Sequence, residues 1–125
     1  CDVINADGGT RTAAITGAWV ALKLAVEYLL KKQMLKEDPI IEQIAAISCG
    51  IFNEKIMIDL NYLEDSSAET DANFVLTNSN KIIEIQATAE KKPFEKNELD
   101  EMLIMAKKEI NTIFNIQKYC ISDEK

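Results

Sequence analysis

The sequence predicts an α+β fold in which a mixed or antiparallel sheet packs against helices. Two long helical patterns lie near the ends of the chain, and four short runs rich in β-favouring residues lie between them. The chain has 125 residues, 47% of them hydrophobic. That is enough for one domain with a core, or for part of a larger domain.

The first 40 residues read as a strand end followed by a long helix. Residues 1–6 resemble the end of a strand, and residues 10–32 have the length and composition of a helix. The first half of this helix is apolar nearly all round, so we expect it to be buried. Pro39 then ends the pattern, because proline disfavours helix at the residue before it.

The middle of the chain reads as two pairs of strands. The runs 43–52 and 55–62 are rich in isoleucine and are separated by two residues, which is hairpin spacing without the usual glycine. The runs 72–78 and 81–90 flank a second short polar turn. From Leu99 onward, apolar residues recur at the spacing of an amphipathic helix that packs on a sheet.

Composition narrows the chemistry that the chain can carry. Fourteen Lys and Arg against twenty-one Asp and Glu give a net charge of −7, so phosphate or RNA binding must be local or assisted by another chain. The chain has no histidine, which excludes Ser/His and Cys/His nucleophilic machinery. Its three cysteines are widely spaced and suggest neither a disulfide framework nor a zinc site.

The same totals give an expectation about location. The longest uninterrupted apolar stretch is too short to span a bilayer, and no cleavable leader is evident. We therefore expect a soluble, cytoplasmic protein without a membrane partner.

One candidate site is the glycine turn before the first helix, Asp7-Gly8-Gly9-Thr10-Arg11-Thr12. Glycines there allow close approach of a ligand, and the free N–H groups of a helix start favour an anion. Arg11 is the only arginine in the chain, and its planar guanidinium can grip two phosphate oxygens. The alternative is that Thr10 caps the helix and Arg11 makes an ordinary surface salt bridge.

A second candidate site is an acidic stretch of five carboxylates between Lys55 and Lys81. Divalent cations prefer carboxylate oxygens, and such a cluster repels itself without a cation nearby. Asp65 and Asp71 would lie on different faces of a continuous helix, so they converge only if residues 66–70 form a turn. The alternative is a solvated acidic loop.

Two segments carry a resemblance to a known family. The run CDVINADGGTRTAAITGAWVAL resembles the strand-to-helix junction of the ribonuclease PH family of phosphorolytic exoribonucleases. The stretch from IAAISCGIF to KKPF, containing LEDSSAETDAN, resembles the second half of that family. The resemblance implies that residues 1–40 are the last strand and helix of a first lobe, and that residues 41–125 are the second lobe.

The resemblance also implies an activity and its residues. Family members are tRNA nucleotidyltransferases, phosphate-dependent 3′-to-5′ exoribonucleases that trim the 3′ ends of tRNA precursors, act in rRNA processing and release nucleoside diphosphates. It implies inorganic phosphate as co-substrate, bound by Gly9, Thr10 and Arg11. It further implies Mg²⁺ or Mn²⁺ at Asp65 and Asp71 as metal and catalytic residues, with Asp65 assisting proton transfer.

The resemblance covers only the second half of the family, which sets expectations about partners. We expect this chain to supply half of an active site, to be inactive alone, and to need a missing N-terminal half or other subunits. Family members form homo-oligomeric rings, commonly hexamers, that bind RNA. The alternatives are a non-catalytic ring subunit resembling those of the exosome and an inactive fragment with a structural role.

Overall fold

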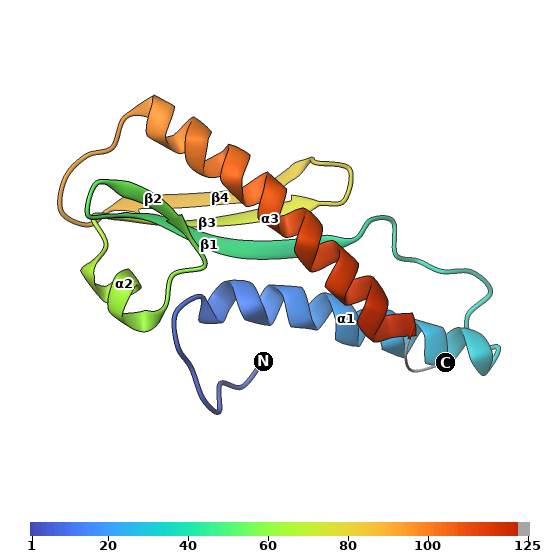
Figure 1. Cartoon of the computed structure of the whole chain (residues 1–125). Helices are drawn as coiled ribbons and strands as arrows, with labels where there is room; N and C mark the ends of the chain where they lie inside the picture. Colours follow the sequence, from blue (N-terminus) through green and yellow to red (C-terminus); the bar gives the residue numbers. More distant parts are fainter. Residues whose placement is uncertain (123–125) are drawn as a thin grey trace.

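A computed structural model describes residues 1–122 as an antiparallel sheet with two long helices and one short helix (Figure 1). This confirms the predicted α+β class, with two long helices flanking four strands along the chain. The elements in chain order are α1 (Thr10–Lys31), β1 (Ile44–Phe52), β2 (Lys55–Ile58), α2 (Tyr62–Ser67), β3 (Thr70–Thr77), β4 (Ile82–Ala89) and α3 (Lys96–Ser122).

The four strands form one sheet in the order β2-β1-β3-β4, and each neighbouring pair is antiparallel. Both predicted hairpins are present. In the β1–β2 turn, Asn53 and Glu54 both have positive φ, of 50° and 59°. These are the conformations that a two-residue hairpin requires, and here they are adopted without glycine.

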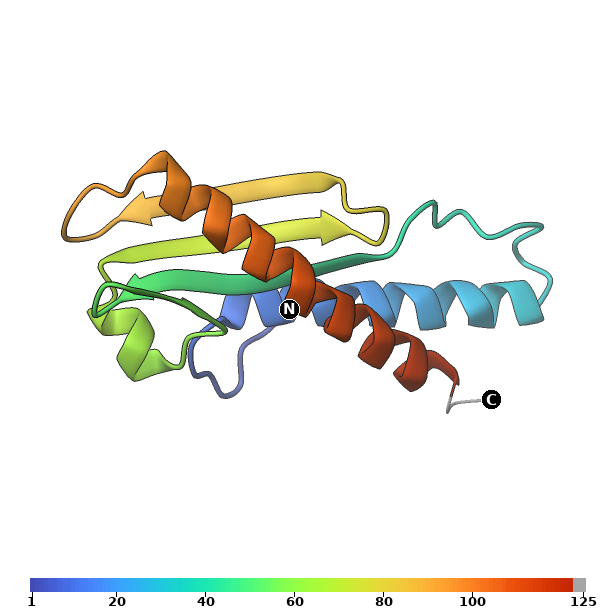
Figure 2. The same cartoon turned by 45° about the horizontal axis from the view of Figure 1, so that its top comes forward.

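One face of the sheet is covered by α3, which crosses the strands diagonally (Figures 1 and 2). Side chains of a strand alternate between faces, so every second residue of β1 and β3 meets α3. The residues that form this core are Ala45, Ile47, Cys49, Ile51, Ala72, Phe74, Leu76, Met102, Ala106, Ile110 and Phe114. The apolar period of the last helix therefore predicted its packing correctly.

Helix α1 lies beside β1 and meets α3 near the C-terminal end of α3 (Figure 1). The Thr16 hydroxyl bonds to the backbone of Ala46, and the buried Gln117 of α3 donates to the Thr16 carbonyl. Only Thr12 and Val26 of α1 are buried, so the prediction that its first half is buried is wrong for this chain. The helix packs along one side, and no described element covers the other.

The apolar composition of α1 also bears on whether this helix could span a membrane. By length and composition alone, α1 meets the criterion for a membrane-spanning helix, with a mean hydropathy of 1.5 over its 18-residue window. One such helix is weak evidence for a membrane span; only 6% of that window is buried, and α1 contacts β1 and α3 along one side.

Two segments differ from the sequence-based prediction. Residues 1–6 form no strand, because no described strand lies next to them to complete their backbone hydrogen bonds. The short helix α2 was predicted as part of a strand and a turn. Its start is defined by a capping box, in which the Asn61 side chain accepts from the Glu64 N–H and the Glu64 side chain accepts from the Asn61 N–H.

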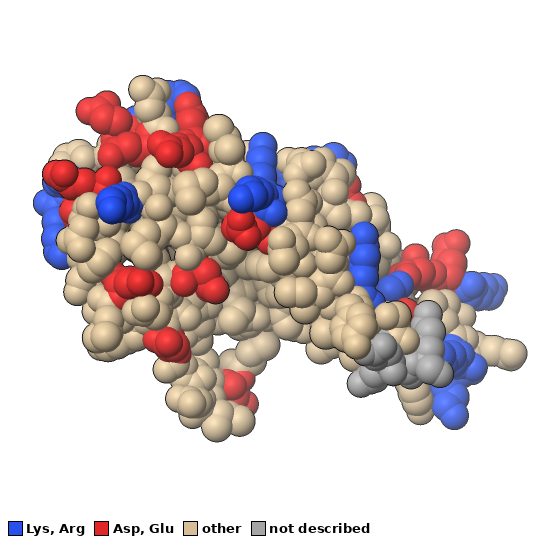
Figure 3. Space-filling model, in the orientation of Figure 1, with Lys and Arg blue, Asp and Glu red and all other residues tan. Residues whose placement is uncertain are grey.

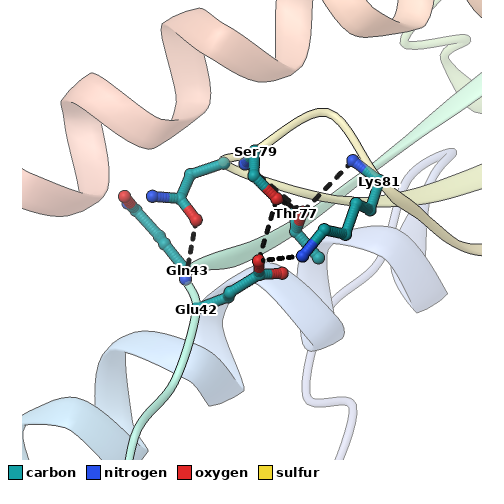
Figure 4. A network of polar contacts seen from close by, with 6 residues as sticks. Glu42, Gln43, Thr77, Ser79 and Lys81 are labelled. Atoms are coloured by element: carbon teal, nitrogen blue, oxygen red, sulfur yellow. Dashed lines mark hydrogen bonds and ion pairs between the residues drawn. The ribbon is translucent and has the colours of Figure 1, made fainter.

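The β3–β4 turn is anchored to the segment that leads into β1 (Figure 4). Glu42 accepts hydrogen bonds from the Ser79 hydroxyl and from the Lys81 ammonium group, both at 2.8 Å. The Thr77 hydroxyl lies 2.9 Å from the Ser79 hydroxyl and accepts from two backbone N–H groups of the turn. These bonds hold the β3–β4 turn against Glu42, two residues before β1.

Candidate phosphate and metal site

The glycine turn before α1 is held in place by Asp7. Its carboxylate accepts hydrogen bonds from the Gly8 N–H at 2.9 Å and from the Tyr62 N–H of α2 at 2.6 Å. Gly8 lies so close to the chain at Leu60 that a Cβ would be 1.9 Å from the Leu60 carbonyl oxygen. Glycine is therefore required there, and the turn is attached to the start of α2.

The start of α1 presents unpaired backbone donors. Gly9 is the N-cap residue with φ of 67°, and no side chain caps the helix. The first helical hydrogen bond runs from the Ala13 N–H to the Gly9 carbonyl, so the N–H groups of Thr10, Arg11 and Thr12 have no acceptor within the helix. The Thr10 hydroxyl donates to the Asp7 carbonyl rather than capping the helix. Such a helix start favours an anion.

Arg11 projects from this helix start to Glu84 on β4. Its two terminal nitrogens lie 2.8 and 2.9 Å from the two carboxylate oxygens of Glu84. The hydrogen bond raises the pKa of Arg11 and lowers the pKa of Glu84. The salt bridge that the sequence left open as an alternative is thus present. It does not exhaust Arg11, because guanidinium has five N–H donors and this pair uses two.

The two aspartates predicted to converge do line one cavity. Asp65 is in α2 and Asp71 is the second residue of β3, and the chain turns between them at Ala68. The cavity has a volume of about 320 Å³. It is lined by Gly9, Thr10, Arg11, Ser48, Asp65, Asp71, Asn73 and Gln86. The structure therefore brings all five predicted site residues to one place.

The two carboxyl groups differ in environment. Asp71 is half-buried, and burial, followed by the charges of Asp65 and Glu90, raises its pKa. A cation bound nearby would favour the charged form of this carboxyl and lower its pKa again. Asp71 is thus the carboxyl in the cavity with a raised pKa, which makes it a candidate for proton exchange or for binding a positively charged ligand.

The carboxylates of the cavity suit Mg²⁺ better than a metal ion that is enclosed by three or more protein ligands. Among residues 1–122, no group of three or more His, Cys, Asp or Glu side chains could enclose an ion. Mg²⁺ keeps several waters and is commonly bound by one or two carboxylates together with substrate phosphates. Asp65 and Asp71 supply that number of carboxylates, and the helix start lies on the same cavity.

Four lining or supporting residues escaped the sequence-based prediction. Glu84, Ser48, Asn73 and Gln86 lie on three different strands and meet only through strand register. In β4, and in the first half of β3, the alternation of polar and apolar residues was a usable signal, because it separates Asn73, Glu84 and Gln86 from the core positions. In β1 the signal was that Ser48 is the one polar residue of an apolar strand. What it does not give is which residue of one strand lies opposite which residue of the next.

These features define an α+β domain with an uncapped helix start beside a pair of carboxylates, and the comparisons identify its family. Residues 42–109 match the family described as "3′ exoribonuclease family, domain 2". Two sequences named ribonuclease PH, from Caulobacter vibrioides strains NA1000 / CB15N and ATCC 19089 / CIP 103742 / CB 15, are each 57% identical over 121 residues. The chain belongs to the 3′ exoribonuclease family, of the ribonuclease PH type.

The extent of these matches limits what they establish. They cover 97% of this chain and 51% of each Caulobacter sequence, so the chain spans about half the length of the curated relatives it matches. The crystal structure of rice (Oryza sativa) Rrp46 is similar in fold, with a TM-score of 0.74 and 18% identity. That match covers 96% of this chain and 51% of the rice chain.

Proposed function

We propose that this chain supplies half of the active site of a phosphate-dependent 3′-to-5′ exoribonuclease that shortens RNA and releases nucleoside diphosphates. The observation that carries the proposal is the single cavity shared by Arg11, the open start of α1, Asp65 and Asp71. Trimming of tRNA precursors is the proposed use of this activity. Inorganic phosphate is the proposed co-substrate, in a homo-oligomeric, cytoplasmic assembly.

In this mechanism the helix start and Arg11 bind and orient inorganic phosphate. The backbone N–H groups and the guanidinium donors face negative charge, which holds the nucleophile in line with the last phosphodiester. An oxygen of the bound phosphate forms a bond to phosphorus as the bond from phosphorus to the 3′ oxygen of the preceding nucleotide breaks. The products are a nucleoside diphosphate and RNA shortened by one residue.

The departing 3′ oxygen needs a proton, and we assign this step to Asp71. The sequence-based interpretation gave it to Asp65. Asp71 is the better donor because burial raises its pKa, so it holds a proton at a higher pH than an ordinary carboxyl. Asp65 then remains the main carboxylate for Mg²⁺ or Mn²⁺, with Asp71 beside it. When bound, such an ion would neutralise charge on the phosphoryl group.

RNA binding requires surface that this chain does not supply by charge alone. Its net charge is −7, and Figure 3 shows acidic side chains gathered over the start of α3 with no continuous stripe of described Lys or Arg on that face. The apolar residues of α1 are half-buried or exposed except Val26, and they provide a surface for another chain. We propose that the N-terminal half of the enzyme, or another subunit, covers α1 and contributes the basic RNA track.

The test is phosphate-dependent release of nucleoside diphosphates from an RNA oligonucleotide. The chain alone is expected to be inactive, and addition of the remaining half of the Caulobacter ribonuclease PH is expected to restore release. Arg11→Gln should abolish release, whereas Lys36→Gln, which removes one charge at an exposed position outside the cavity, should not. Equal activity of the two variants would contradict the proposal.

A non-catalytic ring subunit is the alternative function. It would need the fold and the α1 surface but not the contents of the cavity. The retention of Arg11, Asp65 and Asp71 around one cavity therefore favours the enzyme. A mixture that assembles with the remaining half yet releases no nucleoside diphosphate would favour the alternative.

A further inference from the structure

A row of three polar side chains crosses the sheet on the face turned away from the α3 core. Ser48 of β1 lies opposite Asn73 of β3, and Asn73 lies opposite Gln86 of β4. Opposed residues of antiparallel strands project to the same side, and all three line the cavity that contains Arg11. Ser48 is buried, Asn73 half-buried and Gln86 exposed, so the row leads from the cavity floor to solvent.

Ser48 is the unusual member of this row. Ser48 is 4% exposed, and its hydroxyl has no hydrogen-bond partner among residues 1–122. The neighbouring hydroxyls of Thr10 and Thr12 donate to the carbonyls of Asp7 and Gly9. A buried hydroxyl without a partner is costly and uncommon, so its presence points to an acceptor that arrives from outside the chain.

The position of Ser48 indicates that the missing acceptor is an anion at the start of α1. A Cβ placed on Gly9 would lie 3.2 Å from the Ser48 hydroxyl oxygen, 3.3 Å from that of Thr12 and 3.7 Å from a carboxylate oxygen of Asp59. The Ser48 hydroxyl therefore lies directly against the glycine that begins α1, where the unpaired backbone N–H groups are. A neutral O–H donor at this point adds a hydrogen bond to an anion without adding charge.

We propose that Ser48 is a further phosphate-binding residue, whose hydroxyl donates to an oxygen of inorganic phosphate held at the start of α1. This inference rests on the proposed function and names one more residue of the same site. It places the phosphate between the helix start and the floor of the sheet, with Arg11 on the β4 side. Asn73 is the next donor along the row.

The chain offers a matched control for Ser48. Thr70, at the start of β3, is 1% exposed and also has a hydroxyl without a partner among the described residues, but it does not line the cavity. Removing either hydroxyl deletes one buried polar group from a central strand. Only the removal at Ser48 should change phosphate affinity.

The experiment is a calorimetric titration of the 125-residue chain with inorganic phosphate. Ser48→Ala is expected to weaken binding roughly tenfold, and Thr70→Val to change it less than twofold. Ser48→Cys, which keeps the volume and offers only a weak S–H donor, should also bind severalfold more weakly and carries the test if Ser48→Ala does not fold. Wild-type affinity in a folded Ser48 variant would overturn the inference.

The titration also separates this inference from the proposed function. If the wild-type chain binds phosphate, Arg11→Gln does not, and Ser48→Ala binds as the wild type does, only the role of Ser48 is wrong. If the wild-type chain does not bind phosphate, the proposed phosphate site is wrong and the role of Ser48 falls with it.

Discussion

The face of the sheet under α3 and the opposite face are made by the same strands with different side chains. Under α3, β1 and β3 present residues such as Ile47, Cys49 and Phe74, all buried in one apolar core. On the opposite face, the positions in between include Ser48, Asp71 and Asn73, which line the polar cavity. Alternation along a strand thus lets one sheet supply a stable core on one side and a reactive surface on the other.

The two faces of the sheet also differ in how far other elements cover them. The α3 face is covered over β1 and β3, where the helix crosses the sheet diagonally (Figure 2). The opposite face is closed only beside α1, and the cavity there contains an unpartnered hydroxyl and a carboxyl whose pKa is raised by burial. Stability is therefore expected to depend on the first face, and ligand binding on the second.

The largest expected effect is a loss of stability when a core residue under α3 is replaced. Phe74 is fully buried beneath α3, and Phe74→Ala should lower the free energy of unfolding by about 3–5 kcal/mol, because it leaves a cavity in the core. Urea unfolding followed by circular dichroism measures this change. Ile104→Ala, at a 68% exposed position of α3, is the control and should cost less than about 0.5 kcal/mol. Equal losses would contradict the assignment of the core.

A smaller loss of stability is expected at the turn that carries the polar site. Gly8→Ala places a methyl group 1.9 Å from the Leu60 carbonyl oxygen, so the turn must move away from α2 at a cost of about 1–3 kcal/mol. Gly17→Ala is the matched control, since nothing lies within 4 Å of its Cβ. It should stabilise the helix by about 0.5–1 kcal/mol. Thermal unfolding distinguishes the two variants, and equal melting temperatures would contradict the close contact between Gly8 and Leu60.

Asp71 should show the trade-off between stability and function. Because its folded pKa is raised, the folded state holds this proton more tightly than the unfolded state does, and stability falls as pH rises through the two values. Asp71→Asn should therefore raise stability at neutral pH, by less than about 1 kcal/mol because the group is partly solvated. At a pH below both values the gain should disappear. Urea unfolding of both proteins at neutral pH and at the lower pH tests this. A lower free energy of unfolding for Asp71→Asn at neutral pH would contradict it.

The smallest expected effect concerns the competition for Arg11. Glu84 pairs with two of its donors, so Glu84 opposes an incoming phosphate with a negative charge. Glu84→Gln keeps an acceptor for Arg11 and removes that charge, and phosphate affinity should rise about threefold, within the range of an exposed ion pair. Glu101→Gln, at an exposed position of α3 outside the cavity, is the control. A weaker affinity for Glu84→Gln would instead show that the pair is needed to orient Arg11.

Most of the fold could be predicted from local pattern. The spacing of apolar residues from Leu99 onward predicted α3. Two isoleucine-rich runs, and two further strand-like runs around a polar turn, predicted the four strands. The burial of α1 could not be predicted, because an apolar helix indicates that some partner covers it and not which one. Residues 1–6 were misassigned for a related reason, since a strand depends on a neighbour that the local sequence does not describe.

The candidate site was predictable in part. Arg11 stood out as the only arginine beside two glycines, and Asp65 and Asp71 stood out within an acidic stretch. Glu84 and Ser48 did not, because their place depends on strand register, which includes an irregularity between Val75 and Leu76. Contacts between residues 73 apart in sequence, such as Arg11 and Glu84, follow from that register rather than from any local motif.

The most direct test of the central claim is a phosphate titration of the ¹⁵N-labelled chain followed by amide chemical shifts. The account predicts that the largest shifts occur at Gly9, Thr10 and Arg11, with Ser48 affected across the cavity and the core positions of α3 unchanged. Shifts confined to the lysines at the other end of α1, Lys31 and Lys32, would show that phosphate binds by surface charge alone and would contradict the account.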